Sequence, residues 1–432
     1  MSINTKLVPI DAEAIIQLSQ AQHEPVWMTN LRQEGIALAG QLDLPILEKT
    51  NLDRWNTQAY GEYHETSSPE ALTELLSNNP LLSNQENLFV QINSNHVHVK
   101  LSDDLQSKGV IFTDIASALT THSDLLQRYF MKAIPSNENR FTALHTALWS
   151  GGVFLYVPKN VHVAIPLQAL FMSNNAEARF SPHIVIIAEA NSSVTYVENM
   201  ISQISEGHIV HSGIVEVFVQ PGAKVRVASI HNFQSAITDY TYRRAIVETG
   251  GTIEWILGEM NHGYAVSDTT SILKGNGSSS YTKAICVGTE DQKLDLTSRV
   301  IHFGQHSSSD MLTRAVMKDR STAIINGITK IEKGANGTNG QQTEKILMLS
   351  PGARGDANPI LLIDEDDVKA GHAASVGQVN ADHIYYLMSR GISRENAERL
   401  IIYGFLAPII SEIPLKHIQD QLQNLVERKL GQ

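Results

Sequence analysis

The chain has 432 residues, of which 42% are hydrophobic and 18% charged, a composition that supports two or three folded domains with a sizeable core. Its formal net charge is −12 and it contains no block of Lys and Arg; nucleic acids and anionic membranes both need a basic face, so neither is expected as the main partner. Cys286 is the only cysteine, which excludes an intramolecular disulfide and any site built from several thiols of this chain.

The hydropathy pattern indicates neither a signal peptide nor a membrane-spanning helix. The start of the chain, MSINTKLVPIDAEAIIQL, has no apolar core of signal-peptide length. The longest apolar run, Leu400 to Ile410, contains Pro408 and is too short to span a bilayer. We therefore expect a cytoplasmic protein.

The first third of the chain is predicted to be helical and then mixed. Residues 1–80 are expected to form an N-terminal helical domain, with Asp11 capping a first helix, Pro25 beginning a second, and a third following Ser67, Ser68 and Pro69. Residues 81–145 are expected to form a mixed α/β capping segment. Within it LFVQI and HVHVKL predict strands, and DIASALTTHSDLLQRYFMKAI predicts a helix.

From Gly151 onward, short β-rich runs such as VFLYVP, HIVIIAEA and KVRVASI alternate with small polar turns, without a helix of ordinary length. Turn positions recur every 28 to 31 residues, at Asn191, Gly222, Gly250, Ser278 and Ser307. A loose repeat of this size, holding at least two short strands, is typical of a solenoid. We therefore predict a mainly β fold with a parallel β-helix core over residues 146–370.

The alternative fold is an antiparallel β-sandwich. Two-residue hairpin signals are few, with Asn276-Gly277 and Asn326-Gly327 the main ones, so the solenoid is favoured. A solenoid leaves open sheet edges that must be capped or paired. The helical flanks suit caps, whereas the end near residues 310–360 looks less covered and is expected to pair with another chain.

The helical period returns at the C-terminus, and residues 371–432 are predicted to form a helical domain. Asn380 and Ser393 are expected to cap two helices, and Pro414 to start a third.

The Gly-rich stretch from Gly334 to Thr343 does not match a phosphate-binding loop. It lacks the Gly-Lys-Ser/Thr that supplies the phosphate-binding lysine and the magnesium-binding hydroxyl. We interpret it as a turn-forming loop and expect this chain neither to bind nor to hydrolyse ATP.

Other candidate groups have simple structural interpretations. The histidine pairs lack further ligands nearby in sequence; they are His96/His98, His208/His211 and His302/His306. Cys286 is expected to pack in the core, with a nucleophilic role the less favoured alternative. The acidic groups Asp291/Asp295 and Asp364/Asp366/Asp367 do not establish the paired carboxylates of a glycosidase, and we place the second group outside the repeat, beside a helix start.

His372 remains the candidate of interest. It stands among small residues in VKAGHAASVG, which leave room for close approach. A structural role is the simplest interpretation. If His372 is a ligand, the other ligands must come from another chain, because iron–sulfur clusters need about four ligands, mostly thiolates.

Several blocks resemble the SufB/SufD family of the SUF iron–sulfur cluster assembly system. The C-terminal DDVKAGHAASVGQV and IYYLMSRGISRENAERLIIYGF are the most specific, and HEPVWMTNLRQEGI, EKTNLDRWN and WSGGVFLYVPKNVHVAIPLQ agree with them. The resemblance covers essentially the whole chain and is greater to the SufD side, because the SufB side is expected to bring an assembly cysteine of its own.

The resemblance implies a right-handed parallel β-helix between helical domains. It implies a non-enzymatic subunit in a complex with SufB, paired through the β-helix end, and with the ATPase SufC, docked on the C-terminal helices. The implied docking residues are Met388, Arg390, Gly391, Ala397, Leu400, Ile401, Tyr403 and Phe405. It also implies that His372 lies at the SufB interface and contributes to a transient iron–sulfur cluster together with a cysteine of SufB.

Some SufD sequences carry a cysteine where this chain has Ala370, so its own contribution depends on His372 alone. Our hypothesis is that ATP-driven dimerisation of SufC moves the helical domains and exposes the groups near His372. Two alternatives stay open: a polysaccharide-processing β-helix enzyme and a purely structural subunit. The sequence also leaves open whether the isolated chain forms a homodimer, whether a flavin binds the complex, and which donors and acceptors it serves.

Overall fold

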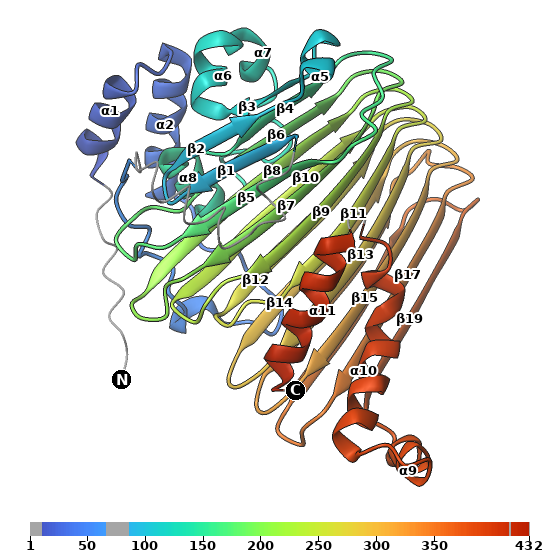
Figure 1. The fold of residues 1–432 in the computed structure, drawn as a ribbon. Coiled ribbons are helices and arrows are strands. Elements are labelled where there is room, and N and C mark those ends of the chain that lie inside the picture. The colour runs from blue at the N-terminus through green and yellow to red at the C-terminus, as the bar shows by residue number, and fades with distance from the viewer. Residues whose placement is uncertain (1–10, 66–85, 414–415, 432) are drawn as a thin grey trace.

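The computed structural model describes residues 11–65, 86–413 and 416–431 (Figure 1). Its centre is a parallel β-solenoid of about eight turns, each of which contributes one strand to each of two sheets. Successive strands of the solenoid pair in parallel, as β10 and β12 do, whereas β1 with β2 and β3 with β4 pair antiparallel at its start. The predicted parallel β-helix is therefore confirmed, and the sandwich alternative is wrong.

Two sheets enclose the interior of the solenoid. The first has ten strands in the order β19-β17-β15-β13-β11-β9-β7-β5-β1-β2, and the second has nine in the order β18-β16-β14-β12-β10-β8-β6-β4-β3. The first sheet comprises β1 (Leu88–Ile92), β2 (Asn95–Lys100), β5 (Leu167–Ser173), β7 (Ser193–Ser202), β9 (Lys224–Asn232), β11 (Thr252–Glu259), β13 (Ser279–Gly288), β15 (Ser308–Met317), β17 (Asn339–Met348) and β19 (Lys369–Gln378). The second comprises β3 (Ile111–Asp114), β4 (Val153–Val157), β6 (His183–Ala188), β8 (Ile209–Val219), β10 (Ile237–Val247), β12 (Ala265–Leu273), β14 (Lys293–His302), β16 (Thr322–Ile331) and β18 (Arg354–Ile363).

One corner of the solenoid is a stack of residues with left-handed backbone. They are Asn191, Gly222, Gly250, Gly277 and His306, with φ between 54° and 71°. Each N–H donates to a carbonyl one turn further on, as Asn191 N–H does to Pro221 O at 2.9 Å. The predicted repeat is thus confirmed, although the last two left-handed residues come one position before Ser278 and Ser307.

The N-terminal helices lie at the start of the solenoid (Figure 1). They are α1 (Ala12–Ala21), α2 (Val26–Ala39), α5 (Asp103–Ser107), α6 (Ile115–Thr121), α7 (Ser123–Gln127) and α8 (Arg140–Leu148). The 3-10 turn η1 (Leu52–Arg54) lies further along the solenoid, where Thr50 contacts Asp295 of β14 and Trp55 contacts Tyr240 of β10. Asp11 caps α1 and Pro25 precedes α2, as predicted. The helix predicted after Ser67–Pro69 lies outside the described residues.

The helix predicted to run to Ile134 is wrong in length, because only α6 and α7 form. Beyond them, the backbone N–H groups of Met131, Ala133 and Ile134 donate to the buried carboxylate of Glu216 on β8, at 2.6, 2.6 and 2.9 Å. A carboxylate from the sheet therefore satisfies donors that a helix would have bonded internally.

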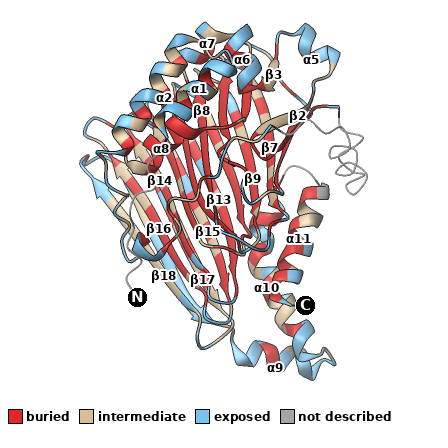
Figure 2. Ribbon diagram, turned by 90° about the vertical axis from the view of Figure 1, so that its left-hand side faces the viewer, coloured by how far each residue is buried: buried red, intermediate tan, exposed pale blue. Residues whose placement is uncertain are grey.

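The three C-terminal helices form as predicted: α9 (Ala381–Ser389), α10 (Arg394–Ile410) and α11 (Lys416–Leu430). Asn380 and Ser393 cap α9 and α10 through side-chain oxygens, while Pro414 lies outside the described residues. Helices α10 and α11 pack their apolar faces on the outer face of the first sheet, whereas α9 extends away from the body (Figures 1 and 2). No described helix is long and apolar enough to cross a membrane.

The boundary predicted at residue 370 is wrong, because the solenoid continues through β19 to Gln378. The acidic run 364–367 is accordingly a turn between β18 and β19 and not the start of a helix. Glu365 accepts a hydrogen bond from Gly334 N–H at 2.9 Å, 31 residues earlier. That separation continues the repeat, so His372 belongs to the last turn of the solenoid.

Candidate functional site at the open end of the solenoid

His372 occupies an interior position of the solenoid. It pairs with Gln342 of β17 in parallel register, so the two side chains point to the same side of the sheet. Gln342 is 1% exposed and accepts a hydrogen bond from Thr329 Oγ1 at 3.0 Å within the interior. The same ladder of inward positions runs back through Met311, Thr282, Trp255, Val227 and Tyr196. His372 is therefore the last step of a ladder that follows the core of the molecule.

His372 is exposed because the solenoid stops there. β19 ends the first sheet and β18 ends the second, so no further turn covers them among the described residues. The inward positions Ala374 and Val376 of β19 are exposed as well. The small residues around His372 thus line the open mouth of the interior, which leaves space for groups from another molecule.

Apolar side chains surround this open end. Leu362 and Ile363 of β18 are 47% and 42% exposed, and Val376 of β19 is 44% exposed. Figure 2 shows β18 as a largely uncovered strand at the margin of the solenoid. Exposed apolar groups beside two free strand edges are typical of a surface that another chain covers.

A carboxyl group that the sequence analysis missed lies one strand inward. Glu344 of β17 points into the interior opposite Ala374, is 1% exposed, and has no hydrogen-bond partner for Oε2 among the described residues. Burial raises the pKa of Glu344 to about 7. The sequence could have indicated this position, because residues two apart in a strand point to the same face, and Glu344 lies two residues after Gln342. At neutral pH this carboxyl can therefore accept or release a proton near the mouth.

Cys286 is a core residue, as predicted. It lies in the interior with 0% exposure, and burial raises the pKa of its thiol to about 12. β13, which carries it, is separated from β19 by β15 and β17, which amounts to roughly 14 Å at the usual strand spacing. The chain therefore does not bring its own thiol beside His372.

A buried cluster deeper in the solenoid joins three groups that can bind metals. His211 Nδ1 and His231 Nδ1 lie 2.8 and 2.7 Å from the two carboxylate oxygens of Asp239. His231 Nε2 in turn lies 2.9 Å from the guanidinium of Arg243. Because these atoms are bonded to one another and next to a cation, the cluster is an internal hydrogen-bond network. Sequence spacing linked His211 to His208, which is exposed and apart from it.

In the other histidine pairs that the sequence offered, the contacts of each histidine are with other residues. His302 is buried between Ser307 Oγ and Ser309 Oγ at 2.8 and 2.9 Å, and burial lowers its pKa to about 4, whereas His306 is a left-handed corner residue. His96 Nδ1 lies 3.4 Å from a carboxylate oxygen of Asp114. None of these contacts includes the partner histidine that the sequence offered.

The remaining sequence candidates are structural. Asp291 is exposed and paired with Arg320, whereas Asp295 is buried against Thr50 and Asn326. The two carboxylates therefore do not share one environment, as a glycosidase pair would across a groove. The Gly-rich stretch is a solenoid corner that leads into β17, and not a loop that opens a helix.

The implied docking residues on α9 and α10 divide into two groups. Ala397 is fully buried, Tyr403 donates its hydroxyl to Glu427, and the ring of Phe405 lies 5.2 Å from the guanidinium of Arg314. These three residues hold the helices to each other and to the solenoid. Met388, Arg390, Gly391 and Leu400 are exposed, and Ile401 is half-buried. Two tyrosines that the sequence analysis did not select, Tyr385 and Tyr386, are 74% and 57% exposed on α9.

Comparison with known proteins agrees with this architecture. The family model for the SufBD core domain of SUF system FeS cluster assembly matches residues 171–405, and the model for the SufBD N-terminal region matches residues 21–169. The chain belongs to the SufB/SufD family. It is 44% identical over 437 residues, covering all of both chains, to the iron–sulfur cluster assembly protein SufD of Bacillus subtilis.

The SufD side of the SufB/SufD family is the better match. Iron–sulfur cluster assembly protein SufB of Bacillus subtilis is 29% identical over 94% of this chain and 90% of its own. An iron–sulfur cluster assembly SufBD family protein of Staphylococcus epidermidis is also 29% identical, over 93% of this chain and 89% of its own. The chain is thus a SufD-type protein of iron–sulfur cluster assembly.

Proposed function

We propose that this SufD-type chain is a non-ATPase subunit that pairs with SufB through the open end of its solenoid. The observation that carries the proposal is His372, an interior position left uncovered at the end of the ladder. Two free strand edges can add strands from a second solenoid, and Leu362, Ile363 and Val376 offer apolar area to bury. In the isolated chain the same edges can pair with a second copy.

His372 then contributes to cluster assembly in a site shared with SufB. A neutral imidazole can ligate iron or accept a proton from a thiol, since its pKa normally lies close to cellular pH. The thiolates must come from SufB, because Cys286 is fully buried. The cluster is cargo of this site and is passed on to recipient proteins.

The second part of the proposal is that SufC docks on α9 and the start of α10. Tyr385, Tyr386, Met388 and Leu400 give this surface exposed apolar groups, and Arg390 gives it a charge. Aromatic residues and Arg are the side chains most enriched at binding hot spots. ATP hydrolysis belongs to SufC, and its dimerisation moves the helices relative to the solenoid and opens the mouth around His372. We place this assembly in the cytoplasm.

Co-expression with SufB and SufC tests the proposal. We expect a complex that contains all three proteins, with bound iron and sulfide after anaerobic purification. His372→Ala should leave the subunit stoichiometry intact and remove most of the iron and sulfide. Ser375→Ala is the matched control, because Ser375 lies on the same strand in an outward position.

Two outcomes distinguish the alternatives. A normal iron and sulfide content in the His372→Ala complex would favour a purely structural subunit. Turnover of acidic polysaccharides by the isolated chain would favour the enzyme alternative, although Asp291 and Asp295 give it little support.

A further inference from the structure

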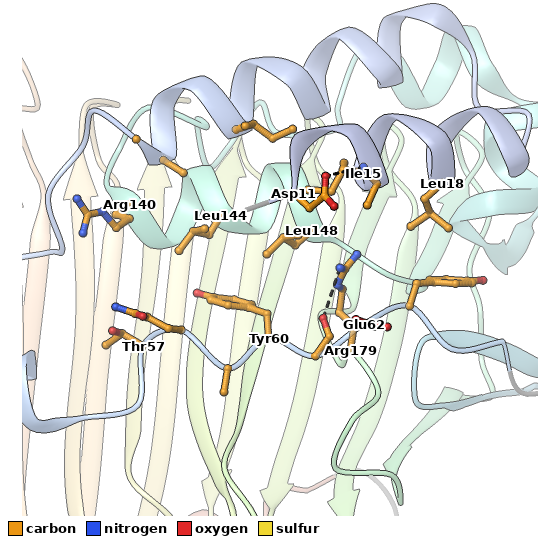
Figure 3. A pocket seen from close by; sticks show the side chains of 18 residues that line it. Asp11, Ile15, Leu18, Thr57, Tyr60, Glu62, Arg140, Leu144, Leu148 and Arg179 are labelled. Carbon is orange, nitrogen blue, oxygen red and sulfur yellow. Dashed lines mark hydrogen bonds between the residues drawn. The ribbon is translucent and has the colours of Figure 1, made fainter. Parts of the chain in front are cut away.

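A cavity of about 890 Å³ lies at the opposite end of the molecule from His372. Helices α1, α2 and α8 form one wall, and the extended segment 57–63 forms the other (Figure 3). Its apolar lining includes Ile15 and Leu18 of α1 and Leu144 and Leu148 of α8. A volume of this size with a mainly apolar lining is typical of sites for small organic ligands.

The guanidinium of Arg179 points into this cavity (Figure 3). Arg179 is 8% exposed, and its guanidinium extends toward Ile15 and Leu148 in Figure 3. Its Nη2 makes one long hydrogen bond to Gly61 O at 3.4 Å, while Nε and Nη1 have no partner among the described residues. Burial also lowers the pKa of Arg179 to about 10. A buried cation without a counter-ion is costly, so the site favours an anion.

The position of Arg179 is fixed by its backbone. Its N–H donates to Glu62 O at 2.6 Å, and its carbonyl accepts from Ser94 Oγ at 2.8 Å. The backbone that carries this side chain is therefore anchored beside the cavity. Among charged side chains, Arg32 lowers the pKa of Arg179 and the exposed carboxylate of Glu62 raises it. Glu62 forms no ion pair with Arg179 among the described residues.

A second unpaired donor lines the same cavity. Tyr60 is 5% exposed, and its hydroxyl has no hydrogen-bond partner among the described residues. Burial raises the pKa of Tyr60, so the hydroxyl stays protonated and can donate. In Figure 3 its ring extends below Leu144, on the far side of Leu148 from Arg179. The cavity thus offers a hydrogen-bond donor on either side of the apolar side chains of Leu144 and Leu148, namely Arg179 and Tyr60.

We propose that this cavity binds an amphipathic carboxylic acid. The carboxylate pairs with the guanidinium of Arg179, the apolar body lies against Leu144 and Leu148, and a second oxygen of the ligand can accept from Tyr60. Guanidinium groups bind carboxylates through two parallel hydrogen bonds, and here Nε and one terminal nitrogen are free to do so. The site is separate from the cluster-assembly site.

Calorimetric titration of the full chain with octanoate and with 1-octanol tests the proposal. We expect octanoate to bind with a dissociation constant of roughly 1 mM or tighter and 1-octanol to bind at least about tenfold more weakly. Arg179→Gln should weaken octanoate by about tenfold or more and leave 1-octanol unchanged. Glu62→Gln should tighten octanoate binding several-fold, because it removes the competing negative charge.

Two controls complete the experiment. Arg128→Gln should change neither ligand, because Arg128 is exposed and does not line the cavity. Ala14→Trp, at an exposed position of α1 on the cavity rim, should block both ligands. Thermal melting verifies folding, and Arg179→Gln should raise the melting temperature of the free chain. Equal binding of octanoate to the parent and Arg179→Gln, or no binding at 10 mM (about ten times the expected constant), would overturn the proposal.

Discussion

His372 lies directly opposite Gln342 in the β17–β19 ladder, yet Gln342 is 1% exposed and His372 is exposed. The two residues hold equivalent positions in successive turns, and their environments differ because no described turn of the solenoid follows β19. His372 therefore places an ionisable side chain at the surface, at a register position that is buried in the preceding turn. This relationship makes His372 accessible to a partner without any rearrangement of the solenoid.

The first prediction concerns the stability of the isolated chain. His372→Ala should change the free energy of unfolding by less than about 0.5 kcal/mol, since the side chain is exposed. Gln342→Ala should cost about 1–3 kcal/mol, because it leaves Thr329 Oγ1 without its buried acceptor. Urea unfolding monitored by circular dichroism measures both. A large loss in His372→Ala would indicate a structural histidine and weaken the proposed role in cluster assembly.

The second prediction concerns α9. The double substitution Tyr385→Ala/Tyr386→Ala should weaken binding of SufC at least about tenfold, as expected for exposed aromatic residues at a contact, and should not change the unfolding transition. Surface plasmon resonance with immobilised SufC measures the affinity. Ile46→Ala is the control, since Ile46 is 99% exposed but lies in the N-terminal region. Unchanged affinity of the double variant would exclude α9 as the main contact.

The features predictable from the sequence are those encoded locally. Left-handed corner residues such as Gly222 and Gly250 recur at the spacing of one turn, because each stacks on the next. The helix caps Asn380 and Ser393 were likewise predictable, because a side-chain oxygen just before an apolar helical pattern is a common start of a helix. Both kinds of signal depend on neighbours within a few residues or on a regular repeat.

The features that sequence could not predict depend on which strands become neighbours. Asp239 joins His211 and His231 only because three strands of the two sheets meet across the interior. The helix predicted to run to Ile134 stops early because β8 places the carboxylate of Glu216 where it accepts a hydrogen bond from Met131 N–H. The end of the solenoid was also misplaced, because β19 carries the small or polar residues Ala370, His372 and Ala374 at inward positions, and such a segment does not show the apolar pattern of a strand.

The third prediction concerns the buried carboxylate of Asp239. It accepts hydrogen bonds from both histidines and from Thr241 Oγ1 and Asn261 Nδ2, at 2.7 to 2.9 Å. Asp239→Ala should therefore lower the free energy of unfolding by about 3–5 kcal/mol, because four buried donors lose their acceptor. Urea unfolding at pH 7.5 measures the loss.

Asp268→Asn is the control for Asp239. Asp268 lies on the neighbouring strand β12, is partly exposed, and lies 3.7 Å from Arg299. It accepts a hydrogen bond from Thr270 Oγ1 at 2.9 Å, which the amide oxygen of Asn can also accept, so Asp268→Asn should cost less than about 1 kcal/mol. Similar losses in the two variants would show that the Asp239 network does not stabilise the core.

The fourth prediction concerns the pH dependence of stability at Glu344. Its pKa in the folded chain is raised from 4.5 to about 7 by burial. The unfolded chain therefore releases this proton at lower pH than the folded chain, so the contribution of Glu344 to stability decreases as pH rises from about 4.5 to 7 and is constant above. Because each pH unit between the two pKa values corresponds to about 1.36 kcal/mol, the full effect is about 3 kcal/mol.

Glu344→Gln removes this ionisation and keeps the shape of the side chain. The variant should be more stable than the parent by about 2–3 kcal/mol at pH 8 and nearly equal to it at pH 4.5. Urea midpoints measured at half-unit intervals between these values test the slope. Asp366→Asn, at a fully exposed carboxylate in the last turn, should follow the parent at every pH. If Glu344→Gln also follows the parent, the carboxyl is solvated and cannot hold a proton beside His372 at neutral pH.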